Sequence, residues 1–288
     1  MKDAILTCCR DEADIIETFI RFYLRMGFDE IYVVDNGSVD GTTEIIEDLI
    51  TTGVPVQLHR DSRLGYERYL TEYYLWAGNQ SQLRWLFFLD ADEFILFPDG
   101  AKRYFADLDP AVNCLRLRQR EMYPALTSQQ MPKIRDAFLL TTRTEMGFND
   151  TTKDVSQFDE HAHILAGKHR IDRPEKRSLT VVDIFIRHYR YRIPDQARRK
   201  ESNRVQAHRT YAREELEHIS AFGPDVSLQW FQLCRERQEA ESWREFFTPA
   251  VLAVEDRELA EWTITSGFFQ RKANVIEPTP PVPDIQGG

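Results

Sequence analysis

The stretch WLFFLDADEF, residues 85–94, joins five large apolar residues to three carboxylates within four positions. An apolar run of this length is typical of a strand that is buried on both faces of a parallel sheet. Burying a carboxylate beside such a strand is unfavourable unless an opposite charge or hydrogen bonds compensate it. We therefore expect a positive charge to balance Asp90, Asp92 and Glu93 at the end of this strand.

The residues before this stretch alternate between expected strands and expected helices. The strands are residues 4–9, 30–35, 54–60 and 84–90, and the helices are residues 13–26, the segment after Asp40, and residues 67–79. Strands that alternate with helices of this length favour right-handed crossovers and a mostly parallel sheet covered on both faces. The sequence thus predicts an α/β fold whose ligands bind at the carboxyl ends of the strands.

Asp90 and Asp92 lie at such a carboxyl end. If the strand continues through both residues, their carboxylates project to the same side, because side chains alternate along a strand. Paired carboxylates suit Mg²⁺ or Mn²⁺, which bind one or two of them together with substrate phosphate oxygens. An Asx-type surface turn is the alternative. The buried strand before the pair favours a metal site, and the cation would balance the charge.

Length and composition limit the classes of protein that fit. The chain has 288 residues, of which 42% are hydrophobic, so it can form one large domain or a domain with an appended lobe. A net charge of -10 argues against general nucleic-acid binding. No apolar run is long enough to cross a bilayer and the start lacks a secretory signal, so we expect a cytoplasmic protein, either free or peripheral to a membrane.

Two further features of the composition carry expectations. Cysteines 8, 9, 114 and 234 show no metal-ligand spacing, which favours buried reduced thiols. Residues 187–209 carry eight Arg or Lys against two acids in an otherwise acidic protein. This segment is either a solvated helix surface or a binding site for a phosphate-bearing or lipid-linked partner.

Two blocks together carry a family resemblance. They are TCCRDEADIIETFIRFYLRMGFDEIYVVDNGSVDGT, residues 7–42, and LDADEF, residues 89–94. In this combination the chain resembles the family 2 glycosyltransferases of the nucleotide-sugar-binding GT-A fold, over roughly residues 3–100. A weaker similarity continues near IRHYRYR and Lys200. The resemblance implies a Rossmann-like, mostly parallel sheet flanked by helices, with a C-terminal helical extension.

The resemblance also implies roles for individual residues. The nucleotide-binding set is Thr7, Arg10, Glu12, Asp35, Asp90, Arg190, Arg192 and Lys200, and the metal-binding set is Asp90, Asp92 and His188. Asp35 would accept a hydrogen bond from the imide N–H of uracil. Cytosine could not make this bond, because its N3 carries no hydrogen. The alternative for Asp35 is a residue that begins a turn. Ser38 and Asp40 are expected to brace the turn and cap the following helix.

The metal, Mn²⁺ or Mg²⁺, would neutralise the charge that builds on the diphosphate as the sugar–phosphate bond breaks. Asp92 is the expected direct ligand, with Asp90 directed toward ribose or a metal-bound water. His188 is a candidate for a further ligand, and basic residues at 190, 192 and 200 would contact the diphosphate. Inversion also requires a general base for the acceptor hydroxyl. The candidates are Glu121, Asp159 and Glu160, whereas His161 and His163 lack a third donor that would make them a metal pair.

The expected organisation follows from these assignments. Residues 1–195 form the catalytic domain, with a nucleotide-binding half at 1–100 and an acceptor-side half at 101–195. Residues 196–275 form a helical lobe rich in aromatic residues, and residues 276–288 form a disordered end. The sequence does not indicate an oligomeric state.

The sequence therefore predicts a metal-dependent inverting glycosyltransferase, hexosyltransferase-like, that moves a sugar from a nucleotide donor. The donor is expected to be a UDP-sugar. The acceptor is a hydroxyl group of a glycan, a lipid-linked carrier or a small molecule, in glycan, polysaccharide or glycoconjugate synthesis. A sugar-phosphate nucleotidyltransferase should have a glycine-rich loop after its first strand, which TCCRDEAD lacks. A phosphatase would carry its DxDxT motif on the first strand. A catalytically silent nucleotide- or glycan-binding scaffold stays open, and turnover separates it from an enzyme.

Overall fold

A computed structural model describes residues 1–63, 65–124, 141–143, 152–189, 196, 199–200, 203 and 254–255. Its strands are β1 (Lys2–Cys9), β2 (Glu30–Asp35), β3 (Val56–Arg60), β4 (Leu83–Leu89), β5 (Glu93–Ile95), β6 (Cys114–Pro124), β7 (Thr141–Arg143), β8 (Thr152–Gln157), β9 (His163–Ile164), β10 (Ile171–Asp172), β11 (Ser178–Thr180), β12 (Ile186–His188) and β13 (Val254–Glu255). Its helices are α1 (Ile16–Arg25), α2 (Thr42–Thr51), α3 (Leu70–Gly78) and α4 (Ala101–Ala106), with short 3₁₀ turns η1 (Tyr66–Tyr69) and η2 (Ala166–Lys168).

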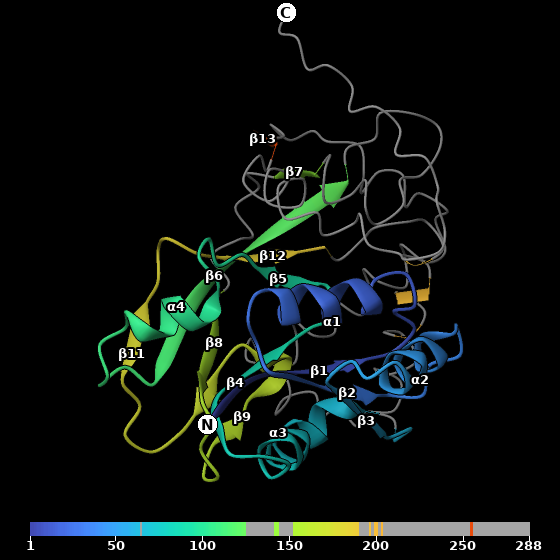
Figure 1. The fold of residues 1–288 in the computed structure, drawn as a ribbon, viewed down its shortest axis with the longest axis horizontal. Coiled ribbons are helices and arrows are strands. Elements are labelled where there is room, and N and C mark those ends of the chain that lie inside the picture. The colour runs from blue at the N-terminus through green and yellow to red at the C-terminus, as the bar shows by residue number, and fades with distance from the viewer. Residues whose placement is uncertain are drawn as a thin grey trace, which may run out of the picture.

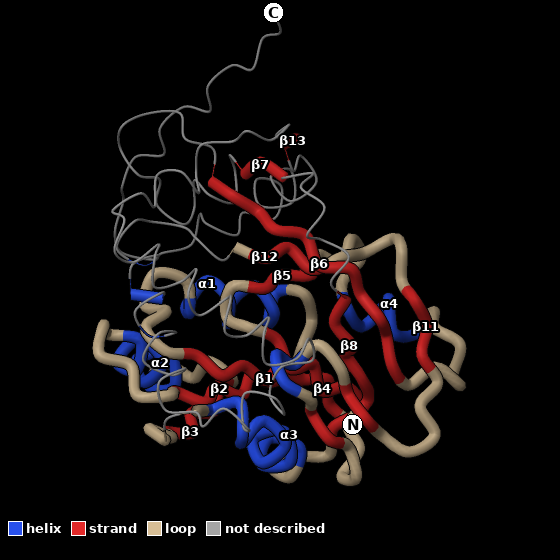
Figure 2. Tube along the Cα trace, turned by 180° about the vertical axis from the view of Figure 1, so that it is seen from behind, coloured by secondary structure: helices blue, strands red, loops and turns tan. Residues whose placement is uncertain are grey.

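The described strands form one large curled sheet and a separate β9–β10 ladder (Figures 1 and 2). At one end of the large sheet the order from the edge inward is β3, β2, β1, β4, and these strands are parallel. β8 joins β4 in the antiparallel direction, and β6 follows β8. This confirms the predicted α/β fold. The chain leaves β1 toward β2 on one side and returns beside β1 as β4, and such a reversal of strand order is where α/β sheets bind ligands.

Helices cover both faces of the parallel strands, with α1 and α3 on opposite sides (Figure 1). The reason is the alternation of side chains along the strands. Ile5, Ile31 and Val33 pack in the same buried cluster as α1, α2 and α4. Leu6 and Val34, their neighbours along the same strands, pack in the second cluster with α3. Both layers of the predicted fold are therefore filled by apolar side chains.

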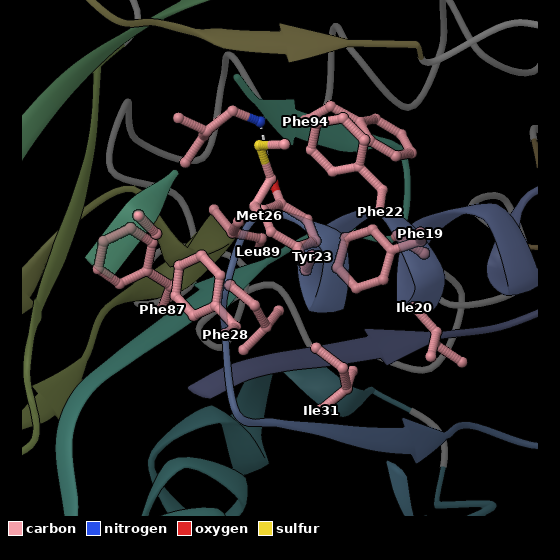
Figure 3. Close-up of a cluster of buried hydrophobic side chains, with 14 of the residues drawn as sticks. Phe19, Ile20, Phe22, Tyr23, Met26, Phe28, Ile31, Phe87, Leu89 and Phe94 are labelled. Carbon is pink, nitrogen blue, oxygen red and sulfur yellow. Dashed lines mark hydrogen bonds between the residues drawn. The ribbon is translucent and has the colours of Figure 1, made fainter. Parts of the chain in front are cut away.

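Helix α1 connects the sheet core to β5. The rings of Phe19, Phe22 and Tyr23 gather around Phe94 of β5 (Figure 3). Each fully buried large apolar side chain of this kind stabilises the fold by about 1.5–3 kcal/mol. The Tyr23 hydroxyl donates to the Glu93 carbonyl at 2.9 Å and accepts from the Ile95 N–H at 3.1 Å. Helix α1 thereby fixes the backbone that follows the DAD sequence.

Helix α3 ends in close contact with the loop after β8. Its last residue, Gly78, lies so near Phe158 that an added Cβ would stand 1.8 Å from a ring carbon. Phe158 also packs against Tyr74 of the same helix, with 5.4 Å between ring centroids. The missing side chain at Gly78 therefore makes room for the phenylalanine ring.

The described cysteines are free and buried, as the sequence predicts. Burial raises the pKa of Cys8 to about 12 and also raises the pKa values of Cys9 and Cys114. Cys234 lies outside the described residues. In the part of the chain that the structure describes, no helix has the length and apolar character needed to span a bilayer.

The predicted helical lobe and the predicted disordered end lie almost entirely outside the described residues. The division at residue 195 therefore stays a prediction.

Candidate active site

The DAD sequence forms the connection between β4 and β5. Strand β4 ends at Leu89, Asp90 and Asp92 lie in the turn that follows, and Glu93 begins β5. The Asp90 side chain is 33% exposed, whereas that of Asp92 is 1% exposed. Because β4 ends at Leu89, the condition under which both carboxylates would project to one side of a strand is not met. The turn directs the two carboxylates to different partners.

Asp90 lies between two lysines. Lys168 Nζ donates to Asp90 Oδ1, and Lys153 Nζ lies 3.3 Å from Asp90 Oδ2. Burial raises the pKa of Asp90, but the charges of Lys153 and Lys168 outweigh it and hold the pKa below its ordinary value. Asp90 is therefore an ionised carboxylate whose orientation is fixed by buried ammonium groups.

Lys168 is itself held in an unusual position. Its backbone has a φ of +58°, a left-handed conformation that is uncommon for residues other than glycine. The ammonium lies 5.2 Å from the centroid of the Phe88 ring and 5.6 Å from that of Tyr66, within the range of cation–π attraction. Burial lowers the pKa of Lys168, but Asp90 outweighs this effect and raises it. The lysine therefore stays charged inside the protein.

Glu93 forms a buried ion pair with Lys153, the second of these lysines. Lys153 Nζ lies 2.6 Å from Glu93 Oε1, and both side chains are fully buried. Glu93 Oε2 also accepts the Asp90 N–H at 2.8 Å. Burial raises the pKa of Glu93. This buried carboxylate braces the turn from inside.

Asp92 forms the other half of the site. Its Oδ2 accepts a hydrogen bond from Lys200 Nζ, which also lies 3.6 Å from Glu12 Oε1. Its Oδ1 lies 3.4 Å from His188 Nε2. The other ring nitrogen of His188, Nδ1, lies 2.7 Å from Gln119 Nε2. The Asp92 carbonyl accepts the Tyr189 N–H at 2.8 Å, which ties β12 to the turn.

The positive charges expected beside Asp90, Asp92 and Glu93 are thus supplied by lysine side chains in this structure. Lys153 and Lys168 belong to β8 and η2, more than 60 positions after the turn in the chain. Sequence reasoning missed both, because an isolated lysine in TKDVSQ or AGKHR carries no spacing pattern that would connect it to Asp90. Only the antiparallel addition of β8 beside β4 brings them together.

Asp92 and His188 are the described donors that a divalent cation could use. Adjacent ligands that each bind one small cation at about 2.1 Å lie roughly 3 Å apart, and Asp92 Oδ1 and His188 Nε2 come near this separation. Among the described residues no group of three or more His, Cys, Asp or Glu side chains is arranged to hold a metal ion. The donor set therefore suits a cation whose remaining ligands are waters and substrate phosphate oxygens.

The predicted nucleotide-binding residues lie at the adjoining strand ends. Thr7 and Arg10 belong to β1 and its end, and Asp35 ends β2 directly opposite Cys9. The Thr7 hydroxyl is buried and has no hydrogen-bond partner among the described residues. Asp35 accepts from the Ser38 N–H at 3.2 Å and from the Thr43 hydroxyl at 2.9 Å. It therefore braces the turn, and an ionised carboxylate has further acceptor positions for a base.

In the turn after β2, Ser38 and Asp40 brace the backbone as expected, but the N-cap of helix α2 is Gly41 and not Asp40. Asp40 Oδ1 accepts the Thr42 N–H at 3.1 Å, and its Oδ2 accepts the Ala13 N–H at 3.1 Å. The Ser38 hydroxyl accepts the Asp11 N–H at 2.9 Å. These bonds join the first two strand–helix connections into one structure at the edge of the site.

The base candidates fall in different places. Glu121 lies on β6 opposite His188 of β12 in a parallel register, and His188 lies opposite Glu93 of β5. Asp159 and Glu160 lie at the far end of β4, because the Phe158 N–H donates to the Arg84 carbonyl there. The backbone of Glu121 therefore lies beside that of His188, a metal candidate. Asp159 and Glu160 lie at the other end of β4.

The remaining polar residues of that region make other contacts or are exposed. Asp159 lies 3.0 Å from Arg173, and His161 is largely exposed, 3.8 Å from Glu160. His163, on β9, is exposed and is not brought to the DAD turn. Arg190 and Arg192 lie outside the described residues.

Comparison with known proteins identifies the N-terminal part. Residues 4–127 match the family model "Glycosyl transferase family 2". Comparison of the sequence with curated proteins gave no match. Solved structures that align with 93% of the chain include S. aureus TarS 1-349, at 14% identity, 80% of that chain and a TM-score of 0.38. The mannosyltransferase PcManGT from Pyrobaculum calidifontis, in complex with GDP-Man and Mn²⁺, aligns at 12% identity over 80% of its chain with a TM-score of 0.40.

GalNAc-T7 with UDP, GalNAc and Mn²⁺ aligns at 13% identity with 93% of this chain and 58% of its own, with a TM-score of 0.42. At these scores the structural likenesses add no argument about substrate. The family match rests on the segment that contains β1, β2, β4 and the DAD turn. Residues 4–127 therefore match glycosyl transferase family 2, and this match supports a glycosyltransferase.

Proposed function

We propose that the protein transfers a sugar from UDP to a hydroxyl acceptor with inversion, and that the transfer depends on a divalent cation. The observation that carries this proposal is the pairing of Asp92 Oδ1 with His188 Nε2 at 3.4 Å beside the strand ends of a family 2 domain. Two protein ligands leave room for diphosphate oxygens around the same ion. The cation, when bound, would stabilise the negative charge on the leaving diphosphate.

The chain's own residues would bind and orient the donor. Asp90 presents an ionised, partly exposed carboxylate that can accept hydrogen bonds from ribose hydroxyls. Asp35 and the buried Thr7 hydroxyl lie at the neighbouring strand ends, where the base and ribose would enter. Lys200 is the cationic side chain that can contact the diphosphate. The arrangement supports a uridine nucleotide, because Asp35 can accept from the imide N–H.

We assign the general base to Glu121. Its backbone lies opposite His188 across β6 and β12, which places it beside the metal candidates. Asp159 and Glu160 start from the opposite end of β4 and are weaker candidates. A base in this position would take the proton from the acceptor hydroxyl as the sugar is transferred.

Thermal unfolding of the intact protein tests this proposal. A ligand that binds only the folded state at 100 times its Kd stabilises it by about 2.7 kcal/mol. For a chain of this size we expect UDP with Mn²⁺ to raise the Tm by roughly 5–10 °C. UDP without metal, and Mn²⁺ without UDP, should each give a smaller shift.

A panel of GDP, CMP and UDP, each with and without Mn²⁺, completes the experiment. A shift with GDP or CMP and none with UDP would contradict the donor assignment while leaving the transferase activity standing. If no nucleotide shifts the Tm under any condition, the nucleotide-sugar function itself is wrong.

A further inference from the structure

Lys200 occupies one oxygen of the carboxylate that a metal would need, the one that does not face His188. Its ammonium donates to Asp92 Oδ2 and lies 3.6 Å from Glu12 Oε1. The Asp92 and Glu12 side chains are 1% and 10% exposed, and the lysine is 21% exposed. One ammonium group thus bridges two buried carboxylates at the edge of the site.

An ammonium group and a divalent cation that bind the same Asp92 carboxylate destabilise each other. Two like charges that share one carboxylate repel each other strongly in a partly buried site. A metal that binds Asp92 therefore competes with Lys200 for this carboxylate, and an ammonium group that leaves Asp92 needs another anion. The described residues offer it Glu12, whereas a bound diphosphate would offer several oxygens on the exposed side.

We propose that Lys200 is a resident counter-ion of Asp92 that makes the binding of metal and of nucleotide depend on each other. Without nucleotide, Lys200 remains on Asp92 and opposes the metal. When a nucleoside diphosphate binds, Lys200 moves to the diphosphate and Asp92 becomes available to the cation. This inference rests on the proposed function, because it takes Mn²⁺ and a nucleoside diphosphate as the ligands.

The proposal makes a thermodynamic statement that can be measured. If UDP strengthens Mn²⁺ binding by some factor, Mn²⁺ must strengthen UDP binding by the same factor. Part of this factor comes from direct contact between diphosphate and metal, and the rest comes from Lys200. Removing Lys200 should leave the contribution of the diphosphate–metal contact and abolish the contribution of the lysine.

The experiment compares Lys200→Met with Arg199→Met. Arg199 is the adjacent residue, and it faces Asp40 at 3.8 Å, so its loss removes the same charge without touching Asp92. Mn²⁺ binding is measured by the electron paramagnetic resonance of free Mn²⁺, with and without saturating UDP. Circular dichroism checks that each variant is folded. Lys200→Arg serves as a third variant that keeps the charge.

In the wild type and in Arg199→Met we expect UDP to strengthen Mn²⁺ binding by more than about tenfold. In Lys200→Met, Mn²⁺ alone should bind about tenfold more tightly, UDP alone should bind more weakly, and the coupling factor should fall about tenfold. Lys200→Arg should keep most of the coupling.

Two results would overturn the inference. If Lys200→Met binds Mn²⁺ no more tightly than the wild type and keeps its coupling factor, Lys200 does not compete for Asp92. If the wild type binds neither Mn²⁺ nor UDP in any combination, the proposed function fails and this inference fails with it. The first result leaves the proposed function intact, so the two failures can be told apart.

Discussion

Asp92 is the residue on which the proposed chemistry depends most. Its two oxygens face Lys200 and His188, and the side chain is fully buried. Asp92→Asn keeps the size of the side chain but removes the negative charge that would hold a cation. We expect Mn²⁺-dependent hydrolysis of a UDP-sugar to fall by about 10²–10³-fold, comparable with the loss of a residue that stabilises developing charge.

The control for this substitution is Asp107→Asn. Asp107 forms an exposed pair with Arg103 at 3.6 Å and lies in no part of the site, so its activity should equal that of the wild type. Unaltered turnover in a folded Asp92→Asn protein would move the chemistry away from the DAD turn.

The residues that could be predicted from the sequence are those whose partners lie close in the chain or belong to a motif. Asp40 was expected to brace the turn and cap the next helix. Its carboxylate accepts the Thr42 N–H two positions along the chain, whereas the N-cap is Gly41. Asp90 and Asp92 were placed at a strand end by the apolar run before them. Lys153 could not be predicted, because nothing in TKDVSQ tells which carboxylate, 60 positions earlier, it will meet.

At the scale of elements, Lys153 links two strands that the ladder does not join directly. It belongs to β8, and it reaches Glu93 at the start of β5. Lys153→Met would leave Glu93 buried without its cation. Breaking a buried ion pair from one side costs about 3–5 kcal/mol, so we expect a fall of this size in the free energy of unfolding.

Urea unfolding of three variants checks this expectation. Lys153→Met combined with Glu93→Met should recover much of the loss, since replacing both buried charges by apolar side chains is often neutral. Lys2→Met removes one partner of a half-exposed pair with Glu30 and should cost less than about 1 kcal/mol. A Lys153→Met protein as stable as Lys2→Met would show that Glu93 does not need this lysine.

Prediction of the elements worked where a pattern lies within one segment. The strand EIYVVD was expected at residues 30–35 and is observed as Glu30–Asp35. Helix α1 was expected to stop at Gly27, and it ends at Arg25, with Gly27 at a φ of +97°. The end of β4 at Leu89 was not foreseen, because the tight turn at Asp90 is fixed by Glu93 and the distant lysines, not by the apolar run.

For the whole molecule, the free energy of unfolding at low pH should depend on those carboxylates whose pKa values are lowered in the folded state. Arg63 lowers the pKa of Asp61 to about 2 from an ordinary 3.8. Burial raises the pKa values of Asp3 and Asp154, but their basic partners outweigh it and the pKa values are lowered. A lowered folded pKa contributes stability that is present above the unfolded pKa and is lost as the pH falls through the folded pKa.

We therefore expect the free energy of unfolding to decline as the pH falls from about 4 to about 2. Glu93, whose pKa is raised by burial above the ordinary 4.5, acts in the opposite direction but at higher pH, between its unfolded and its folded pKa. Urea midpoints measured across this range provide the test. Asp61→Asn should show a shallower decline than the wild type, and identical slopes for the two proteins would contradict the assignment to Asp61.

The contact between Gly78 and Phe158 sets a limit on attempts to make this enzyme more heat-resistant. Replacing a helical glycine with alanine is a common stabilising choice, worth up to about 1 kcal/mol in an open helix. At Gly78 the new methyl group would overlap the aromatic ring, so the ring would have to leave its place before the helix could benefit. A library designed from helix preferences alone would select the wrong residue at this position.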